Sequence, residues 1–198
     1  MIQDVLVFDA ESNSLHGPVF AIGAVVYRDG KMVEWFFARC PIEGAVDPWV
    51  AANVLPALNA GVGGSPVTHA TPRAMRDAFW QWLTYPRVNT IVVVDCGWPV
   101  EAGLLSACVA DDPTRAFKGP YPLHEVATFL HAAGLDPLAK YAPIVLPDED
   151  EHAHHPVFDA TVSALCVEMA LKRIGVRAIV PPAPAPSITP NEHDGAAA

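Results

Sequence analysis

Two carboxylates, Asp9 and Glu11, lie two residues apart at the end of an apolar run, residues 5–8. A short run of this composition is typical of a strand that is buried on both faces of a sheet. If the strand continues through the pair, both side chains point to the same side, with Cα atoms roughly 6–7 Å apart. Converging carboxylates of this kind bind the divalent cations of two-metal hydrolases. The pair is weak evidence by itself, because solvent-facing strand ends also carry it by chance.

A histidine and another acid lie near the far end of the sequence, with His154 five positions before Asp159. This spacing falls at the entrance to a predicted helix, 158–174. A metal-bound water must lose a proton before it attacks a phosphodiester, and a histidine beside the metal ions is suited to accept that proton. His154 is therefore a candidate base, and Asp159 a candidate metal ligand.

Three histidines, His152, His154 and His155, lie close together in an acidic stretch. They leave two alternatives open. One is a different metallohydrolase built on a zinc site, which needs Cys or further His ligands at suitable spacing. The other is a solvated His-rich loop without chemistry. The carboxylate pair Asp9 and Glu11 favours the divalent-metal site over both.

The elements that position these residues follow from the apolar pattern. Residues 19–27 and 32–37 are strand-like runs joined through Asp29-Gly30, a strong hairpin signal, so three antiparallel strands open the fold. Residues 91–94 form a second buried strand, and the helix that begins at Pro99 indicates a parallel addition to the sheet. Further helices are predicted at 48–59, 72–82, 123–133 and 158–174. This order predicts an α/β fold: a ribonuclease H-like mixed sheet, three antiparallel strands plus parallel strands, flanked by helices.

On these residues the chain resembles the DEDDh 3′–5′ exonuclease superfamily, and within it the compact mycobacterial-type exoribonuclease branch. The first and third motifs of the family are matched, in order, by Asp9, Glu11, Leu15 and Ile22-Gly23-Ala24, and by His154 and Asp159. The match extends over residues 4–174. It implies a site for two ions of Mg²⁺ or Mn²⁺, a wedge role for Leu15 against the terminal base, and a role for Ser12 in holding the 3′ end.

The second motif of the family fits two carboxylates in this sequence, Asp95 and Glu101. Alignment of the downstream Leu104-Leu105 places Glu101 at the ligand position, whereas residue type and the end of the strand favour Asp95. We predict Glu101 as the ligand and keep Asp95 beside it. Trp98, between them, is a candidate for stacking on a base, as aromatics in single-strand channels do. Packing in the core is the alternative for Trp98, as it is for Leu15.

The chain has 198 residues, a net charge of −10 and a pI near 5.1. Tight binding along a long nucleic acid depends on Lys and Arg, so this charge favours a short or single-stranded end as the partner. One domain at 1–178 and a disordered Pro/Ala-rich tail at 179–198 are expected. The widely spaced cysteines suggest buried free thiols, and no leader or membrane span is recognisable, so we expect a cytoplasmic protein.

The sequence therefore predicts a metal-dependent 3′–5′ exonuclease that hydrolyses phosphodiester bonds at the 3′ end of RNA or short single-stranded nucleic acid. The alternative is a catalytically inactive ribonuclease H-like module with a binding or regulatory role, for which the irregular second motif is the warrant. Binding of Mn²⁺ distinguishes the two, because a ligand that binds only the folded state raises its stability. These motifs do not encode the choice between RNA and DNA, and a homodimer is implied by the resemblance alone.

Overall fold

The computed structural model describes residues 4–59, 64–87, 89–148 and 152–175, and the predicted tail at 179–198 lies outside them. The strands are β1 (Asp4–Ser12), β2 (Val19–Arg28), β3 (Lys31–Arg39), β4 (Val67–Thr68), β5 (Thr90–Val94) and β6 (Leu123–Glu125). The helices are α1 (Pro48–Leu58), α2 (Pro72–Leu83), α3 (Ala102–Asp111), α4 (Val126–Ala132), α5 (Ala142–Val145) and α6 (Pro156–Ile174), with two short turns, η1 (Gly97–Glu101) and η2 (Pro113–Arg115).

In the described part of the chain the strands form one six-stranded sheet in the order β4-β3-β2-β1-β5-β6. β1 lies between β2, to which it is antiparallel, and β5, to which it is parallel. β2 and β3 are antiparallel, whereas β3 and β4, and β5 and β6, are parallel pairs. Asp29 and Gly30 join β2 to β3 with φ of 53° and 76°, as a type I′ hairpin turn requires. The predicted mixed sheet is thus confirmed.

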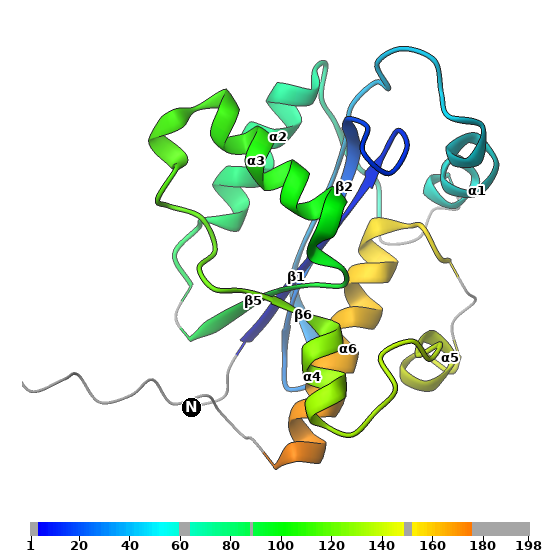
Figure 1. Ribbon diagram of the computed structural model, residues 1–198, viewed down its shortest axis with the longest axis vertical. Helices are drawn as coiled ribbons and strands as arrows, with labels where there is room; N and C mark the ends of the chain where they lie inside the picture. The colour runs from blue at the N-terminus through cyan, green and yellow to red at the C-terminus, as the bar shows by residue number, and fades with distance from the viewer. Residues whose placement is uncertain (1–3, 60–63, 88, 149–151, 176–198) are drawn as a thin grey trace, which may run out of the picture.

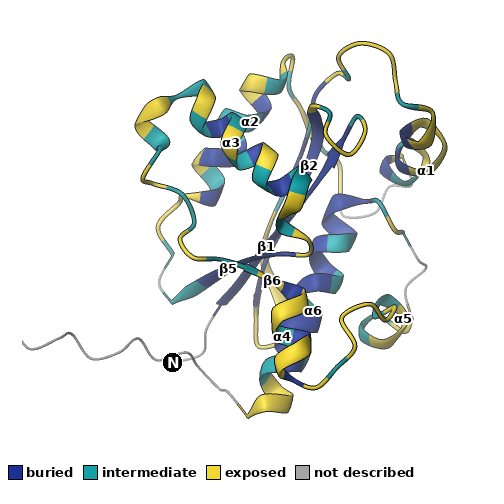
Figure 2. Ribbon diagram, in the orientation of Figure 1, coloured by how far each residue is buried: buried dark blue, intermediate teal, exposed yellow. Residues whose placement is uncertain are grey.

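Helices cover both faces of the sheet (Figure 1). α6 packs on β1 and β2, and α2 packs on β2 and β3 from the other side. Phe8 of β1 contacts Phe79 of α2, with ring centroids 5.3 Å apart. β1 and β2 are almost wholly buried, as Figure 2 shows, which explains their continuous apolar sequence. No helix in the described ranges combines the length and the apolar character needed to cross a membrane.

Two predicted helices begin later than the sequence pattern indicated. Residues 123–133 are not one helix, because Leu123–Glu125 pairs in parallel with β5 and α4 begins only at Val126. Hydrogen bonding to the sheet overrides the local helical spacing there. The segment after Pro99 starts with the irregular turn η1, and the regular helix α3 begins at Ala102.

Gly23 of β2 lies opposite Asp9 of β1, where the start of α6 approaches the sheet. A Cβ atom at Gly23 would lie 2.4 Å from the backbone of Pro156 and of Val157. Glycine is therefore required at this position, because any side chain would push the first turn of α6 away from the strand. The close approach brings Asp159, in the same turn of α6, to the end of β1.

We expect Gly23→Ala to destabilise the protein by about 1–3 kcal/mol, because overpacking forces the backbone to shift. Gly103→Ala in α3 is the matched control, since nothing lies within 4 Å of a Cβ atom there. Helix propensity predicts that the control is neutral or stabilises by up to about 1 kcal/mol. Chemical denaturation measures both free energies of unfolding, and equal values would contradict the close packing of α6 on β2.

Candidate active site

A cleft of about 370 Å³ opens where β1 and β5 end. Asp9 and Glu11 both line it, as their spacing on one strand predicts. The pairing register of β1 with β2 shifts between Glu11 and Ser12, a bulge of the kind that re-aims side chains next to active sites. The remaining predicted residues that line the cleft are Asp95, Glu101, His154, Asp159, Leu15 and Trp98. Ser12 lines an adjoining pocket instead.

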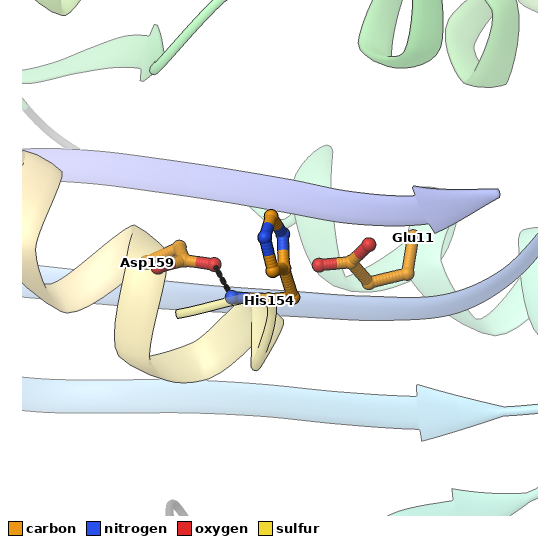
Figure 3. Close-up of side chains that lie close together, drawn as sticks. All are labelled: Glu11, His154 and Asp159. Atoms are coloured by element: carbon orange, nitrogen blue, oxygen red, sulfur yellow. Dashed lines mark hydrogen bonds between the residues drawn. The ribbon is translucent and has the colours of Figure 1, made fainter. Parts of the chain in front are cut away.

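Glu11, His154 and Asp159 form a tight cluster (Figure 3). One ligand atom from each side chain lies within 4.8 Å of the other two, although Glu11 comes from β1, His154 from the loop before α6 and Asp159 from the first turn of α6. Asp159 accepts a hydrogen bond of 2.8 Å from the backbone N–H of His154. His154 itself has a φ of 68°, a left-handed conformation that non-glycine residues seldom adopt and that is often found at functional sites.

Burial and repulsion by neighbouring carboxylates raise the pKa values of Asp9 and Glu11. The pKa of Asp9 lies well above its usual value, first because of burial and then because of the charges of Asp159 and Glu11. Burial, followed by the charges of Asp159 and Glu101, raises the pKa of Glu11 to about 8. Among the described residues that line the cleft, none is a lysine or an arginine. This oxygen-rich donor set fits hard divalent cations such as Mg²⁺ and Mn²⁺, which would offset the repulsion.

Glu101 projects from the turn η1 to the middle of the carboxylate pair. It is buried and accepts a hydrogen bond of 3.3 Å from the backbone N–H of Ala10, the residue between Asp9 and Glu11. Burial raises the pKa of Glu101 to about 7. The charge of Glu101 raises the pKa of both Asp9 and Glu11.

Asp95, at the end of β5, occupies the flank of the cleft. It accepts a hydrogen bond of 3.3 Å from the hydroxyl of Ser163, and burial raises its pKa. Sequence reasoning missed Ser163, although it follows Asp159 by four residues and so shares its face of α6. It also missed Glu125 at the end of β6, which accepts a hydrogen bond of 2.8 Å from the backbone N–H of Gly97 and so holds the start of η1. No local pattern marks Glu125, because its role depends on strand order.

Leu15 and Trp98 form an apolar rim around the acidic cleft. Leu15 is 64% exposed and Trp98 71% exposed, so the alternative of core packing is wrong for both. The Trp98 ring faces the His16 ring, with centroids 6.4 Å apart. Exposed apolar side chains beside a polar cleft are available to a ligand.

The three neighbouring histidines do not converge on a zinc site. His155 is buried, and its ring packs on that of Phe37 with centroids 4.8 Å apart, while burial lowers its pKa to about 4. His152 packs on Phe158. Within the described ranges the one group of three metal-capable side chains is the cluster of His154 with Glu11 and Asp159.

A mixed sheet with its carboxylates at the end of the central β1 strand is the ribonuclease H-like fold that the sequence predicted, in the form found in exonucleases. Exonuclease I from E. coli, solved with zinc and single-stranded DNA, matches with a TM-score of 0.57 and 13% identity over 87% of this chain and 41% of that chain. Exonuclease I from Methylocaldum szegediense matches with a TM-score of 0.57 and 11% identity, over 86% and 40%. Exonuclease X, solved with 5′-overhanging duplex DNA, has a TM-score of 0.50 and 16% identity, over 86% and 93%.

This similarity is one of fold. The chain spans about two fifths of the length of exonuclease I, and nearly all of exonuclease X. No family model and no curated protein matches the sequence. The resemblance to the compact mycobacterial-type branch therefore stays a prediction.

The raised pKa values predict that stability depends on pH and metal. A carboxyl whose pKa rises from 4.5 to about 8, as for Glu11, binds its proton more tightly in the folded state than in the unfolded chain. Its contribution to the stability of the metal-free protein is fully present below about pH 4.5 and is lost as pH rises through about pH 8. We expect the Tm in EDTA to fall between about pH 5 and about pH 8.5.

Mn²⁺ should offset this loss. At about 100 times its Kd the ion adds about 2.7 kcal/mol to the free energy of unfolding, so its effect on Tm should be largest near the upper end of the pH range. Glu11→Gln cannot ionise and should flatten the pH dependence in EDTA. An unchanged pH dependence in this variant would show that the coupling of Glu11 to its neighbours is absent.

Proposed function

We propose that this protein is a metal-dependent 3′–5′ exonuclease of the DEDDh type, which hydrolyses phosphodiester bonds at the 3′ ends of RNA or short single-stranded nucleic acid. The observation that carries the proposal is the convergence of Glu11, His154 and Asp159 at the end of β1. The same cleft contains Asp9 and further carboxylates, and it lies in a fold shared with exonucleases.

The proposed metal ligands are Asp9, Glu11, Asp159 and Glu101, with Asp95 beside them. When bound by these residues, two Mg²⁺ or Mn²⁺ ions would lower the pKa of the attacking water and would offset the charge that develops on the phosphate. His154 accepts the proton of the attacking water, and its place beside Glu11 and Asp159 suits that role. The backbone hydrogen bond from His154 to Asp159 keeps base and ligand in one turn of chain.

The proposed substrate contacts lie on the rim of the cleft, for Leu15 and Trp98, and in the adjoining pocket, for Ser12. Leu15 wedges against the terminal base, Ser12 holds the 3′ end, and Trp98 stacks on a neighbouring base. A net charge of −10 gives little general attraction for a long duplex, so a frayed or single-stranded end is the better substrate. The solved exonuclease I complex contains single-stranded DNA, which supports the same class of end. The exonuclease X complex contains 5′-overhanging duplex DNA, whose 3′ end is paired, and so supports a nucleic-acid end only in general.

An inactive ribonuclease H-like module is the less favoured alternative. It rested on the irregular second motif, yet Glu101 and Asp95 both line the cleft. A scaffold that only binds nucleic acid has no need of repelling carboxylates, which cost stability. A homodimer belongs to the proposal on the family resemblance, and sedimentation velocity measures it. The cytoplasmic location is kept as an expectation from the sequence.

Purified protein with Mn²⁺ should shorten 5′-labelled single-stranded RNA in a ladder that starts at its 3′ end, with DNA of the same sequence as the comparison. Asp9→Asn should lower kcat/KM by at least about 100-fold, more than the loss of a residue that only supports a ligand. His154→Ala should lower kcat by roughly 10²–10⁴-fold, the range of general base catalysis. Glu43→Gln, an exposed acid outside the cleft, is the matched control. Intact RNA and DNA, or equal activity of Asp9→Asn, would reject the proposal.

Variants of Glu101 and Asp95 test which of the two carboxylates is the metal ligand of the second motif. Because Glu101 lies against the Ala10 amide between the first two ligands, Glu101→Gln should lower kcat/KM by at least about 100-fold and weaken Mn²⁺ binding. Asp95→Asn should lower it by only about 10-fold, as expected of a supporting residue. Isothermal titration with Mn²⁺ measures the affinity of both variants. The reverse order of effects would assign the ligand role to Asp95.

A further inference from the structure

A second pocket, of about 450 Å³, adjoins the cleft on the side of α1. We call it the α1 pocket. It shares Glu11, Leu15 and His154 with the cleft, so its contents lie beside the proposed cluster. Leu15 lines it from the β1–β2 connection, and Trp49 lines it from α1.

The ring of Trp49 contacts the imidazole of His154. Their centroids lie 5.0 Å apart and their planes meet at 79°, an edge-on arrangement. Such aromatic pairs contribute about 0.5–1.5 kcal/mol beyond simple burial. Trp49 is 55% exposed, so its ring contributes less to the core than to this contact.

The start of α1 fixes where Trp49 lies. The carboxylate of Asp47 caps the helix by accepting hydrogen bonds of 2.8 Å from the N–H of Trp49 and 3.3 Å from that of Val50. Val50 is buried in the core and anchors this turn. The cap and the buried Val50 therefore fix the backbone from which the Trp49 side chain extends.

Asn13 joins the two walls of the α1 pocket. Its side-chain N–H donates to the carbonyl of Ala45 at 2.9 Å, and its side-chain oxygen accepts from the N–H of Asp47 at 2.8 Å. Asn13 lies two residues before Leu15, and Asp47 lies two residues before Trp49, so the bonds tie the β1–β2 connection to the start of α1. These paired bonds set the spacing of the walls.

We propose that Trp49 is a positioning residue that holds His154 toward Glu11 and Asp159, and that the terminal nucleobase of the substrate completes this arrangement by filling the α1 pocket between Leu15 and Trp49. The proposal rests on the function proposed above. A base in the pocket limits the movement of the Trp49 ring. The Trp49 ring in turn limits the movement of the His154 imidazole, which it contacts edge-on. Hydrolysis is then coupled to the presence of a base at the 3′ end.

The first test compares Trp49→Ala and Trp49→Phe in the full chain with Mn²⁺ and 5′-labelled single-stranded RNA. Misplacing a reacting group by about 1 Å costs on the order of 10²-fold, so the alanine variant should lose roughly 10–100-fold in kcat, and phenylalanine should restore most of it. Trp35→Ala, an exposed tryptophan on β3 outside both pockets, is the matched control and should keep wild-type values. Trp49→Leu replaces the alanine variant if that one unfolds. A rise in KM at unchanged kcat would overturn the positioning role.

The second test removes the base instead of the ring. A substrate with an abasic 3′-terminal residue should lower the wild-type kcat by about the same factor as Trp49→Ala, and the combination should cost no more than either alone, because both act through one contact. Losses that multiply would overturn the coupling of base to imidazole.

A spectroscopic readout separates this proposal from the proposed function. The ring-proton NMR signals of His154 should shift and broaden in Trp49→Ala and stay in place in Trp35→Ala, since a neighbouring indole adds a ring-current shift. A wild-type protein without nuclease activity would reject the proposed function, and these signals would then decide alone on Trp49. Unchanged His154 signals in Trp49→Ala would overturn the positioning role whatever the activity.

Discussion

Repulsion among buried carboxylates at the end of β1 is the constraint on which this structure depends. Asp9, Glu11 and Glu101 line one cleft, where burial raises the pKa of all three; the charges of Glu11 and Glu101 add to this for Asp9, and that of Glu101 adds to it for Glu11. The fold must supply the energy that holds them together. It does so through a central strand buried on both faces and a long helix packed directly on the backbone of β2. The site is electrostatically unfavourable and is held in place by the packed core around it, as is common at functional sites.

The site residues differ in how their backbone is held. Asp9 and Glu11 belong to a strand with a hydrogen-bonded neighbour on each side, whereas Glu101 and His154 come from an irregular turn and a left-handed loop residue. A side-chain acceptor holds each of these two segments: the N–H of Gly97, at the start of the turn, donates to Glu125, and the N–H of His154 donates to Asp159. The positions of Glu101 and His154 thus depend on hydrogen bonds to side chains, and not on pairing within the sheet.

Strand periodicity predicted the sheet, because it is a local property of the sequence. That Asp9 and Glu11 lie in one site with His154 and Asp159 was implied by the family resemblance, because no local pattern joins residues so far apart in the chain. Spacing along the chain could not choose between Asp95 and Glu101, since both reach the same cleft from one short segment. The prediction of one helix at 123–133 was wrong for its first three residues, because their pairing with β5 depends on strand order. Trp49 was missed for the same reason: its partner, His154, is distant in sequence, and no pattern around residue 49 refers to it.

The cluster combines Glu11 from the first strand with Asp159 from α6, and strands β2 to β6 lie between them in the sequence. During synthesis on the ribosome the early carboxylates emerge long before their partners. A nascent or truncated chain that lacks α6 therefore has half of a cation site. The cation site is therefore completed late in synthesis, only after His154 and Asp159 have been made and have packed beside Glu11.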